Sequence, residues 1–407
     1  MDYEMNGEGV ERLEAYFARI GEVLRNKKRK ESFAAYALGL LNEGSRKSME
    51  PIAARVWGDP QHVGSGHQKL QYFLSEADWD DRQVRLSSAR YALDVLSQVA
   101  PVRTWIIDDT GFLKKGKHSV GVQRQYTGTA GKTANCQIGV SLSVATDHAH
   151  LPIDFELFLP EQWTADPERC KSVGVPEGTE FKTKHEIALA MMERAAREGI
   201  PGDVVLADSF YGHSQPFRDA VSLMGFDYGV AIYGTDRMFL LDSKGAVSEE
   251  ARSAKEIGLS LDRSAYRRYT WREGTRGSLS SRFALCRVVV PVQEGAPKSM
   301  SRAEWLVIEW PERETEPTKF VLSTLGEKMR PEEMIRIIRE RYRTERAYEE
   351  MKEELGLDHF EGRSFRGWHH HVSVVLCCYA FVVAERTRHF LPSAPRQDEH
   401  DPLRHAA

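Results

Sequence analysis

The first hundred residues carry apolar side chains at helical spacing. In the stretch VERLEAYFARIGEVL, the residues Leu13, Phe17, Ile20 and Leu24 recur every three or four positions. This spacing places them on one face of a helix. The stretches SFAAYALGLL and DDRQVRLSSARYALDVLSQV extend the helical pattern. We therefore expect residues 1–100 to form an all-helical domain.

The pattern changes after Pro101. Short apolar runs of strand type, such as VRTWIID and DVVLADSFYG, alternate with the helical stretch TKHEIALAMMERAAREG. Strands alternating with helices predict an α/β core, which we assign to residues 101–233. Residues 234–330 are polar and rich in strand patterns, which indicates a β-rich insertion. The core resumes over residues 331–390, and residues 391–407 form a polar tail.

Composition narrows the class of protein but does not identify it. The chain has 407 residues, of which 41% are apolar and 29% charged, and its net charge is −4. Nucleic acid would therefore have to bind to local basic patches. Five scattered cysteines without CxxC spacing favour a reducing cytoplasm. The start of the chain does not resemble a signal peptide, and the apolar run at residues 372–384 is too short to span a membrane, so we interpret it as a buried helix.

One helix near the end of the chain combines charges with an apolar stripe. We predict this helix over residues 341–363, where Arg341, Glu345, Tyr348 and Lys352 are spaced i, i+4, i+7 and i+11. At about 3.6 residues per turn, all four lie on one face. A site that binds a metal through Glu345 and a polyanion through Arg341 and Lys352 would need this arrangement. The alternative is a solvated face with i,i+4 ion pairs.

Two further carboxylates end predicted core strands. Asp108, followed by Asp109, ends the first strand, and Asp208 ends a later one. Sites in open α/β sheets collect at strand ends, and acids converging there with Glu345 would repel one another unless a cation shared them. Mg²⁺ or Mn²⁺ suits oxygen ligands, and two such ions can support phosphoryl transfer. Taken singly, each aspartate has a simpler interpretation as a turn residue or helix cap.

Three long blocks resemble bacterial insertion-sequence transposases of the DDE type. These blocks are IIDDTGFLKKGKHSVGVQRQYTG, VVLADSFYG and EEMKEELGLDHFEGRSFRGWHHH. The resemblance spans roughly residues 10–390. It implies a ribonuclease-H-like core with Asp108, Asp208 and Glu345 as catalytic metal ligands. The D-x-T/S pattern of such cores favours Asp108 as the ligand, with Asp109 as the alternative.

The resemblance also implies an activity and its partners. We expect a Mg²⁺-dependent DNA transposase, with Mn²⁺ as a substitute, that cuts double-stranded DNA at terminal inverted repeats and joins it to target DNA as a homodimer. The alternatives are an inactive DNA-binding descendant and an endonuclease of the same fold without strand transfer. The tyrosine of the family's Tyr-Arg-Glu-Lys signature is replaced by Ile338, so Tyr342 or Tyr348 would have to supply its phosphate contact.

Several further residues are candidate DNA contacts, each with a structural alternative. Trp271, beside Arg272, could hold a flipped base as relatives with an insertion do, or it could pack inside a small β core. Lys114 and Lys115 follow the first aspartate in a predicted loop, where they would contact the DNA backbone or be solvated. The basic run at residues 25–30 includes Lys27, Lys28 and Arg29, and it fits a helical DNA-binding module or a solvated cluster. We interpret His369, His370 and His371 as polar residues at a helix start.

Overall fold

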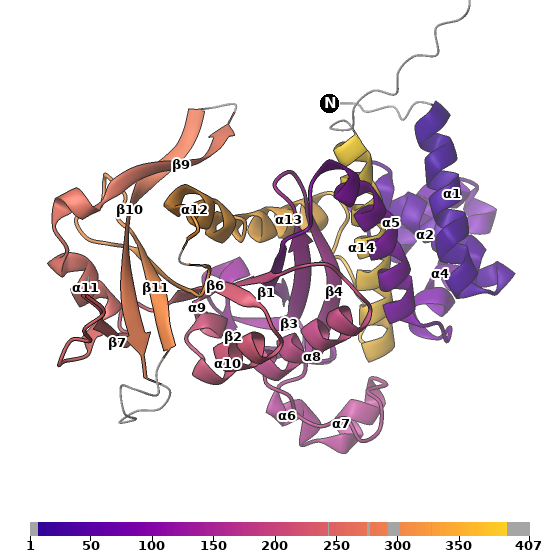
Figure 1. Cartoon of the computed structure of the whole chain (residues 1–407). Helices are drawn as coiled ribbons and strands as arrows, with labels where there is room; N and C mark the ends of the chain where they lie inside the picture. The colour runs from indigo at the N-terminus through magenta and orange to yellow at the C-terminus, as the bar shows by residue number, and fades with distance from the viewer. Residues whose placement is uncertain (1–6, 243, 275–276, 292–301, 327, 389–407) are drawn as a thin grey trace, which may run out of the picture.

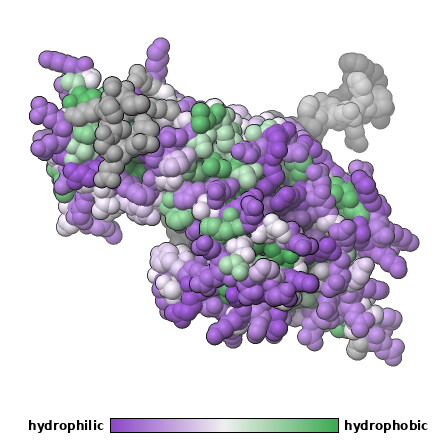
Figure 2. Space-filling model, turned by 90° about the horizontal axis from the view of Figure 1, so that it is seen from below, coloured by the Kyte–Doolittle hydropathy of each residue, from purple (hydrophilic) through white to green (hydrophobic). Residues whose placement is uncertain are grey.

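A computed structural model describes residues 7–242, 244–274, 277–291, 302–326 and 328–388. Its strands and helices form a mixed α/β fold with a helical region at one end and an extended β-rich lobe at the other (Figure 1). This arrangement confirms the predicted fold class. On the face seen from below, the surface is mostly hydrophilic, and small hydrophobic groups come to the surface near the middle of the view (Figure 2).

Five helices precede the sheet and lie to the right in Figure 1. They are α1 (Gly7–Leu24), α2 (Lys27–Leu41), α3 (Met49–Trp57), α4 (Pro60–Ser75) and α5 (Asp81–Val99). Side-chain caps start three of them, because Asn26, Asp59 and Asp80 each accept a backbone N–H of the following first turn.

One sheet runs through the whole molecule. Its strand order is β2-β3-β1-β5-β6-β12-β11-β10-β7-β8, with β4 on β3 and β9 on β10. The core strands are β1 (Thr104–Leu113), β2 (Gln123–Thr127), β3 (Lys132–Ala145), β4 (His150–Phe158), β5 (Val204–Ala207) and β6 (Asp227–Ile232). The strands of the lobe are β7 (Arg237–Leu240), β8 (Arg252–Ser253), β9 (Arg267–Gly274), β10 (Gly277–Val290), β11 (Arg302–Glu309) and β12 (Lys319–Ser323).

The β-rich segment continues the core sheet. Strand β12 pairs antiparallel with β6, and Phe320 lies opposite Ile232. The sequence predicted an insertion but not this edge-to-edge junction, because strand pairing across about ninety residues leaves no local pattern. The lobe is therefore joined to the core through backbone hydrogen bonds.

The remaining helices cover the sheet and join it to the helical region. They are α6 (Glu161–Thr164), α7 (Pro167–Ser172), α8 (Lys184–Arg197), α9 (Ser209–Gly212), α10 (Gln215–Leu223), α11 (Ala254–Ser260), α12 (Pro331–Arg339), α13 (Tyr342–Glu353) and α14 (Phe365–Arg388), and the short 3₁₀ helices are η1 (Gly128–Ala130) and η2 (Arg263–Ala265).

Helix α14 is the central helix of the helical region. It packs against α1, α2, α4, α5 and β4, and one hydrophobic cluster runs from Leu13 of α1 to Ala384 of α14. By length and composition α14 could cross a membrane, but 94% of its apolar window is buried inside the protein. The expected buried helix is confirmed, and it connects the two ends of the chain.

The sequence suggested that the three consecutive histidines are polar residues at a helix start. They lie near the start of α14, but inside the protein. All three are buried, because α14 already lies beneath other helices at this point. The Nδ1 atom of His370 lies 2.8 Å from the Leu74 carbonyl, and the Nδ1 atom of His371 lies 2.8 Å from the Tyr36 hydroxyl. These imidazoles therefore join α14 to α2 and α4.

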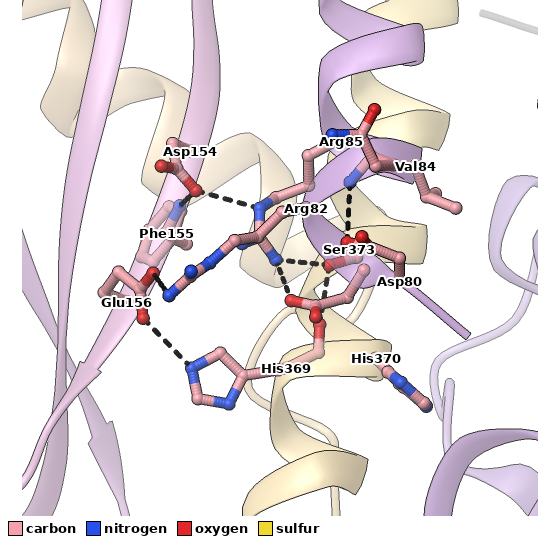
Figure 3. Close-up of polar contacts among 12 residues, drawn as sticks. Asp80, Arg82, Val84, Arg85, Asp154, Phe155, Glu156, His369, His370 and Ser373 are labelled. Carbon is pink, nitrogen blue, oxygen red and sulfur yellow. Dashed lines mark hydrogen bonds and ion pairs between the residues drawn. The ribbon is translucent and has the colours of Figure 1, made fainter. Parts of the chain in front are cut away.

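Buried charges also tie the helical region to the core (Figure 3). Arg85 of α5 is only 2% exposed and donates to Asp154 of β4 at 2.9 Å and to Ser373 of α14 at 2.7 Å. Two residues along β4, the Glu156 carboxylate lies 3.5 Å from His369 of α14. A buried arginine is tolerated only where its donors find acceptors, so these contacts fix how α5, β4 and α14 fit together.

Candidate active site

The sheet register brings Asp108 and Asp208 together. The prediction that Asp108 ends the first strand was wrong, because β1 continues to Leu113, paired with β3. Strands β1 and β5 are adjacent and parallel, and Ile107 lies opposite Ala207. Asp108 is the next residue of β1, and Asp208 directly follows the end of β5. Because neighbouring strands lie about 4.8 Å apart, both carboxylates reach the same edge of the sheet.

Helix α13 places the third carboxylate over that edge. Asp108, Asp208 and Glu345 all line one cleft of about 1190 Å³. Arg341, Tyr348 and Lys352 line it as well, which is the shared helix face that the spacing predicted. The predicted helix was too long, since α13 ends at Glu353 and residues 354–364 form a loop.

Arg341 is the central cation of the cleft. Its guanidinium donates to Asp108 at 2.9 Å and to Glu345 at 3.2 Å. Burial opposes its charge, but Asp108, Glu345 and Asp208 together raise the pKa of Arg341 above its ordinary value. Asp108 and Glu345 thus pair directly with one guanidinium, and the charge of Asp208 acts on it without a recorded ion pair.

The aspartates carry more negative charge than their neighbours neutralise. Burial raises the pKa of Asp108 to about 7 despite Arg341, and Asp208 and Asp109 add to the rise. Burial likewise raises the pKa of Asp208, although its carboxylate accepts the backbone N–H groups of Phe210 and Tyr211. Raised pKa values in a cleft mark a candidate functional site, and a bound cation would relieve the repulsion.

Asp108 and Asp109 face different cations. Successive side chains of a strand point to opposite faces, so Asp108 meets Arg341 of α13 while Asp109 lies 2.7 Å from the Lys184 ammonium of α8. Both aspartates line the cleft. Asp108 shares its guanidinium with Glu345, whereas Asp109 is the carboxylate whose charge helps to raise the pKa of Asp208. The choice of Asp108 over Asp109 stays a prediction.

Lys352 ties the far end of α13 to β1. Its ammonium donates to the Thr110 hydroxyl at 2.8 Å, the Gly111 carbonyl at 2.9 Å and the Thr129 hydroxyl at 3.1 Å. Burial lowers its pKa. All three acceptors are neutral groups, so no hydrogen-bonded carboxylate among them neutralises the positive charge of Lys352. That charge is therefore available to a phosphate that enters the cleft.

Tyr348 was predicted to contact DNA, but its side chain is buried in the core. It is only 6% exposed, its hydroxyl lies 2.5 Å from Ser141 Oγ, and its ring packs edge-on against Phe155. A hydroxyl already used inside the core cannot reach a phosphate, so the structure does not support this contact. Ile338, at the position of the missing tyrosine, lines the cleft and packs beside Gly229.

The insertion tryptophan is packed against the protein. The Trp271 ring lies edge-on to Phe283 at 5.9 Å between centroids, and the Arg339 guanidinium covers it at 4.3 Å. The structure therefore favours the packing alternative over a base-holding wedge. The side chain of Arg272 lies outside the described residues.

The remaining basic candidates differ in exposure. The Lys114 ammonium donates to the Phe360 carbonyl at 2.7 Å and is mostly enclosed, so it holds the loop after α13 against β1. Lys115, Lys27 and Lys28 are exposed and Arg29 is half-buried. The last three occupy the first turn of α2, and they stay predicted DNA contacts.

Two residues near the acids were not found from the sequence: Lys184, which lines the cleft, and Tyr211, which does not. Lys184 looked like any lysine at a helix start, and only the fold brings it to Asp109. Tyr211 is fully buried, and its hydroxyl has no hydrogen-bond partner among the described residues. Burial and the three nearby aspartates raise its pKa well above the ordinary value. This tyrosine belongs to the motif DSFYG, but the sequence alone did not predict that its side chain lies near the three aspartates.

The donor set suits a hard divalent cation, although the side chains are not gathered around one. Across the described part of the chain, no three His, Cys, Asp or Glu side chains are grouped closely enough to hold a metal ion. Arg341 occupies Asp108 and Glu345 with hydrogen bonds. Carboxylate oxygens are the ligands that Mg²⁺ and Mn²⁺ prefer, so the chemistry of the three side chains fits such an ion.

An α/β sheet with one acid inside β1, a second directly after the adjacent β5 and a third on a late helix is typical of a nuclease-type core, and the chain belongs to the DDE superfamily. It matches the DDE superfamily endonuclease family over residues 19–278 and the transposase DDE domain over residues 178–381. The resemblance seen in the sequence blocks is thereby confirmed.

A named relative agrees with this family. The chain is 32% identical over 203 residues to the probable transposase for insertion sequence element IS701 of Microchaete diplosiphon. The match covers 50% of this chain and 48% of that protein. The chain thus spans about half the length of the relative that it matches.

Proposed function

We propose that this protein is a DNA transposase that cuts DNA at the ends of a mobile element and joins the freed ends to target DNA. One observation carries the proposal: Asp108, Asp208 and Glu345, which are far apart in the chain, line one cleft, where Asp108 and Glu345 share the Arg341 guanidinium. Family membership supports the same class of reaction. The protein would act in the bacterial cytoplasm.

In this proposal the three carboxylates are the metal ligands, and Mg²⁺ is the natural ion. Divalent ions bound there would activate the attacking oxygen and stabilise the leaving oxygen. Arg341, released from Asp108 and Glu345, would then be free to pair with the phosphate of the strand being cut. Lys352 would hold a neighbouring phosphate while keeping α13 against β1. The protein's own contribution is positioning and neutralisation of charge.

The helical region would bind the DNA end. Lys27 and Lys28 are exposed at the start of α2 and would contact the phosphate backbone, whose attraction is largely independent of sequence. Binding of two terminal inverted repeats by a homodimer is the arrangement that we propose for joining paired ends.

The test is a nicking and joining assay on labelled duplexes that carry the DNA flanking the gene. We expect cleavage in Mg²⁺ and none in EDTA. Asp208→Asn and Glu345→Gln should abolish cleavage while leaving DNA binding intact. Matched controls are Asp203→Asn, an exposed aspartate just before β5, and Glu354→Gln, an exposed glutamate at the end of α13; both should cleave as the unmodified protein does.

Each outcome separates the proposed reaction from its alternatives. Cleavage that survives Asp208→Asn or Glu345→Gln would refute the assignment of the site. DNA binding without cleavage by the unmodified protein would favour an inactive descendant. Cleavage without joined products, even with supercoiled target DNA present, would favour an endonuclease of the same fold.

A further inference from the structure

The two oxygens of the Asp208 carboxylate have different surroundings. The Oδ1 atom accepts the backbone N–H groups of Phe210 at 3.0 Å and Tyr211 at 3.2 Å, as the cap of the short helix α9. Among the described residues, the structure records no hydrogen bond or ion pair for Oδ2. Because Asp208 lines the cleft, Oδ2 is the oxygen left for a ligand, and the two bonds at Oδ1 set the direction in which it points.

His185 of α8 is hydrogen-bonded to the same turn. Its Nε2 atom lies 3.1 Å from the carbonyl oxygen of Phe210. A carbonyl oxygen only accepts, so Nε2 carries the proton and donates it. The carbonyl of Phe210 and the N–H of Tyr211 belong to one planar peptide unit. A chain of two hydrogen bonds therefore runs from the His185 imidazole through this peptide unit to Oδ1 of Asp208.

This chain of bonds has two physical effects on Asp208. A donor at a peptide carbonyl polarises the peptide unit, which strengthens the bond that its N–H donates. The same donor also opposes rotation of the peptide plane, which would turn the Tyr211 N–H away from the carboxylate. Carboxylates that bind metals are commonly held by such outer partners, and losing one lowers metal affinity or activity by about 10- to 100-fold.

The ring of His185 also packs against aromatic neighbours, which gives an alternative account of this residue. The ring stacks on Phe210 at 4.7 Å between centroids and lies edge-on to Tyr211 at 5.3 Å and to Phe217 of α10 at 5.9 Å. These contacts need only an aromatic ring. The bond to the Phe210 carbonyl needs a donor, so substitutions can separate the two roles.

The start of α8 is well placed to support the site. A reciprocal capping box fixes this end of the helix. Lys184, beside His185, donates to Asp109 at 2.7 Å, and its ammonium lies 4.1 Å from the centre of the Phe210 ring. Two neighbouring residues of α8 therefore contact both β1 and the turn after β5, which are the segments that carry the proposed aspartate ligands.

We propose that His185 is a positioning residue of the candidate active site, which fixes the direction of the Asp208 carboxylate toward a divalent ion through the peptide unit between Phe210 and Tyr211. This inference rests on the proposed function, because it concerns the support of one proposed metal ligand. It extends the site to α8, a helix that carries none of the three acids.

The experiment measures Mn²⁺ binding by the whole chain without DNA, from the electron paramagnetic resonance signal of the free ion. His185→Gln keeps a donor for the Phe210 carbonyl but removes the ring, whereas His185→Phe keeps a ring but removes the donor. We expect His185→Phe to weaken Mn²⁺ binding by about 10- to 100-fold and His185→Gln to bind nearly as the unmodified protein does. Asp208→Asn identifies the binding that belongs to this site.

The matched control is His213→Phe. His213 follows the last residue of α9 and pairs with Asp236 at 2.7 Å, so this change should leave Mn²⁺ binding as it is. Should His185→Phe not fold, as judged by urea unfolding, His185→Leu takes its place, because leucine also fills space without a donor.

A second readout separates metal binding from DNA binding. The cleavage rate is measured over a range of Mg²⁺ concentrations, and DNA affinity is measured in EDTA. His185→Phe should raise the Mg²⁺ concentration that gives half the maximal rate, while its affinity for DNA stays that of the unmodified protein. His185→Gln should stay close to the unmodified protein in both measurements.

The inference and the proposed function fail in different ways. Mn²⁺ binding by His185→Phe that equals or exceeds that of His185→Gln would assign His185 to packing and overturn the inference, as would an equal loss in His213→Phe. The expected order of Mn²⁺ affinities without any cleavage by the unmodified protein would uphold the positioning role while the transposase proposal fails. Mn²⁺ binding that is the same in Asp208→Asn as in the unmodified protein would overturn the inference and the proposed metal site together.

Discussion

Asp108→Asn should stabilise the protein at neutral pH although it removes a proposed catalytic residue. Burial raises the pKa of Asp108 to about 7 in the folded protein, whereas the ordinary pKa of an aspartate, expected in the unfolded chain, is 3.8. Below about pH 4 the carboxyl is protonated in both states and costs nothing. As pH rises, the folded protein retains a proton that the unfolded chain has lost, so the free energy of unfolding falls.

The size of this effect follows from the two pKa values. The folded protein loses about 1.4 kcal/mol of stability per pH unit between about pH 4 and pH 7. The loss is about 1.7 kcal/mol at pH 5 and levels off at about 4 kcal/mol above pH 7. An asparagine removes this cost but weakens the bond to Arg341, at about 1–2 kcal/mol. Asp108→Asn should therefore gain about 2–3 kcal/mol at pH 8 and lose about 0.5–1.5 kcal/mol at pH 4.

Urea unfolding of both proteins from pH 4 to pH 8, followed by circular dichroism in EDTA, measures this difference. The sign of the stability change should reverse near pH 5. Asp203→Asn, at an exposed aspartate of the same sheet, should show no such reversal. A variant that is destabilised at every pH, or a gain that does not vary with pH, would refute the reasoning from buried charge.

Three other changes give simpler tests. Arg85→Met should lower the free energy of unfolding by about 3–5 kcal/mol at neutral pH, because it leaves buried carboxylates without their partner. Burial raises the pKa of Asp81, but the charge of Arg85 helps to lower it below its ordinary value. The loss of stability should therefore shrink below about pH 4, which urea titrations would measure. Lys352→Met should weaken DNA binding and reduce the slope of log affinity against log salt by about one; an unchanged slope would exclude a phosphate contact. Saturating Mg²⁺ should raise the free energy of unfolding by about 2–3 kcal/mol at a hundred times its dissociation constant, and EDTA or Asp208→Asn should remove the gain; an equal gain in the variant would place the ion elsewhere.

Local patterns predicted the parts of the site that depend on local geometry. The 3.6-residue period put Glu345 and Lys352 on one face of α13, in line with Arg341 just before it. The strand patterns put Asp208 correctly after a strand, but they ended the first strand at Asp108, five residues too early. Parallel pairing of β1 and β5 then brings the two aspartates together. The helix was predicted ten residues too long, although Gly356, with φ of 65°, follows the last turn as helix-ending glycines often do.

Contacts between distant segments could not be predicted in this way. The pairing of Lys184 with Asp109 and the joining of β12 to β6 depend on how the whole chain packs. Tyr348 shares the helix face with Glu345, but its side chain is long enough to reach down to Ser141 in the core. The helical period predicts the direction in which a side chain points. Whether that side chain is buried depends on which other segments of the chain pack against it.

The position of α14 has a consequence for synthesis of the protein. The first helices of the chain leave the ribosome long before the helix around which they pack, so α1, α2 and α5 cannot complete their core until Phe365–Arg388 has emerged. A chain cut short before that helix would expose the apolar faces of its first helices and become a substrate for proteases.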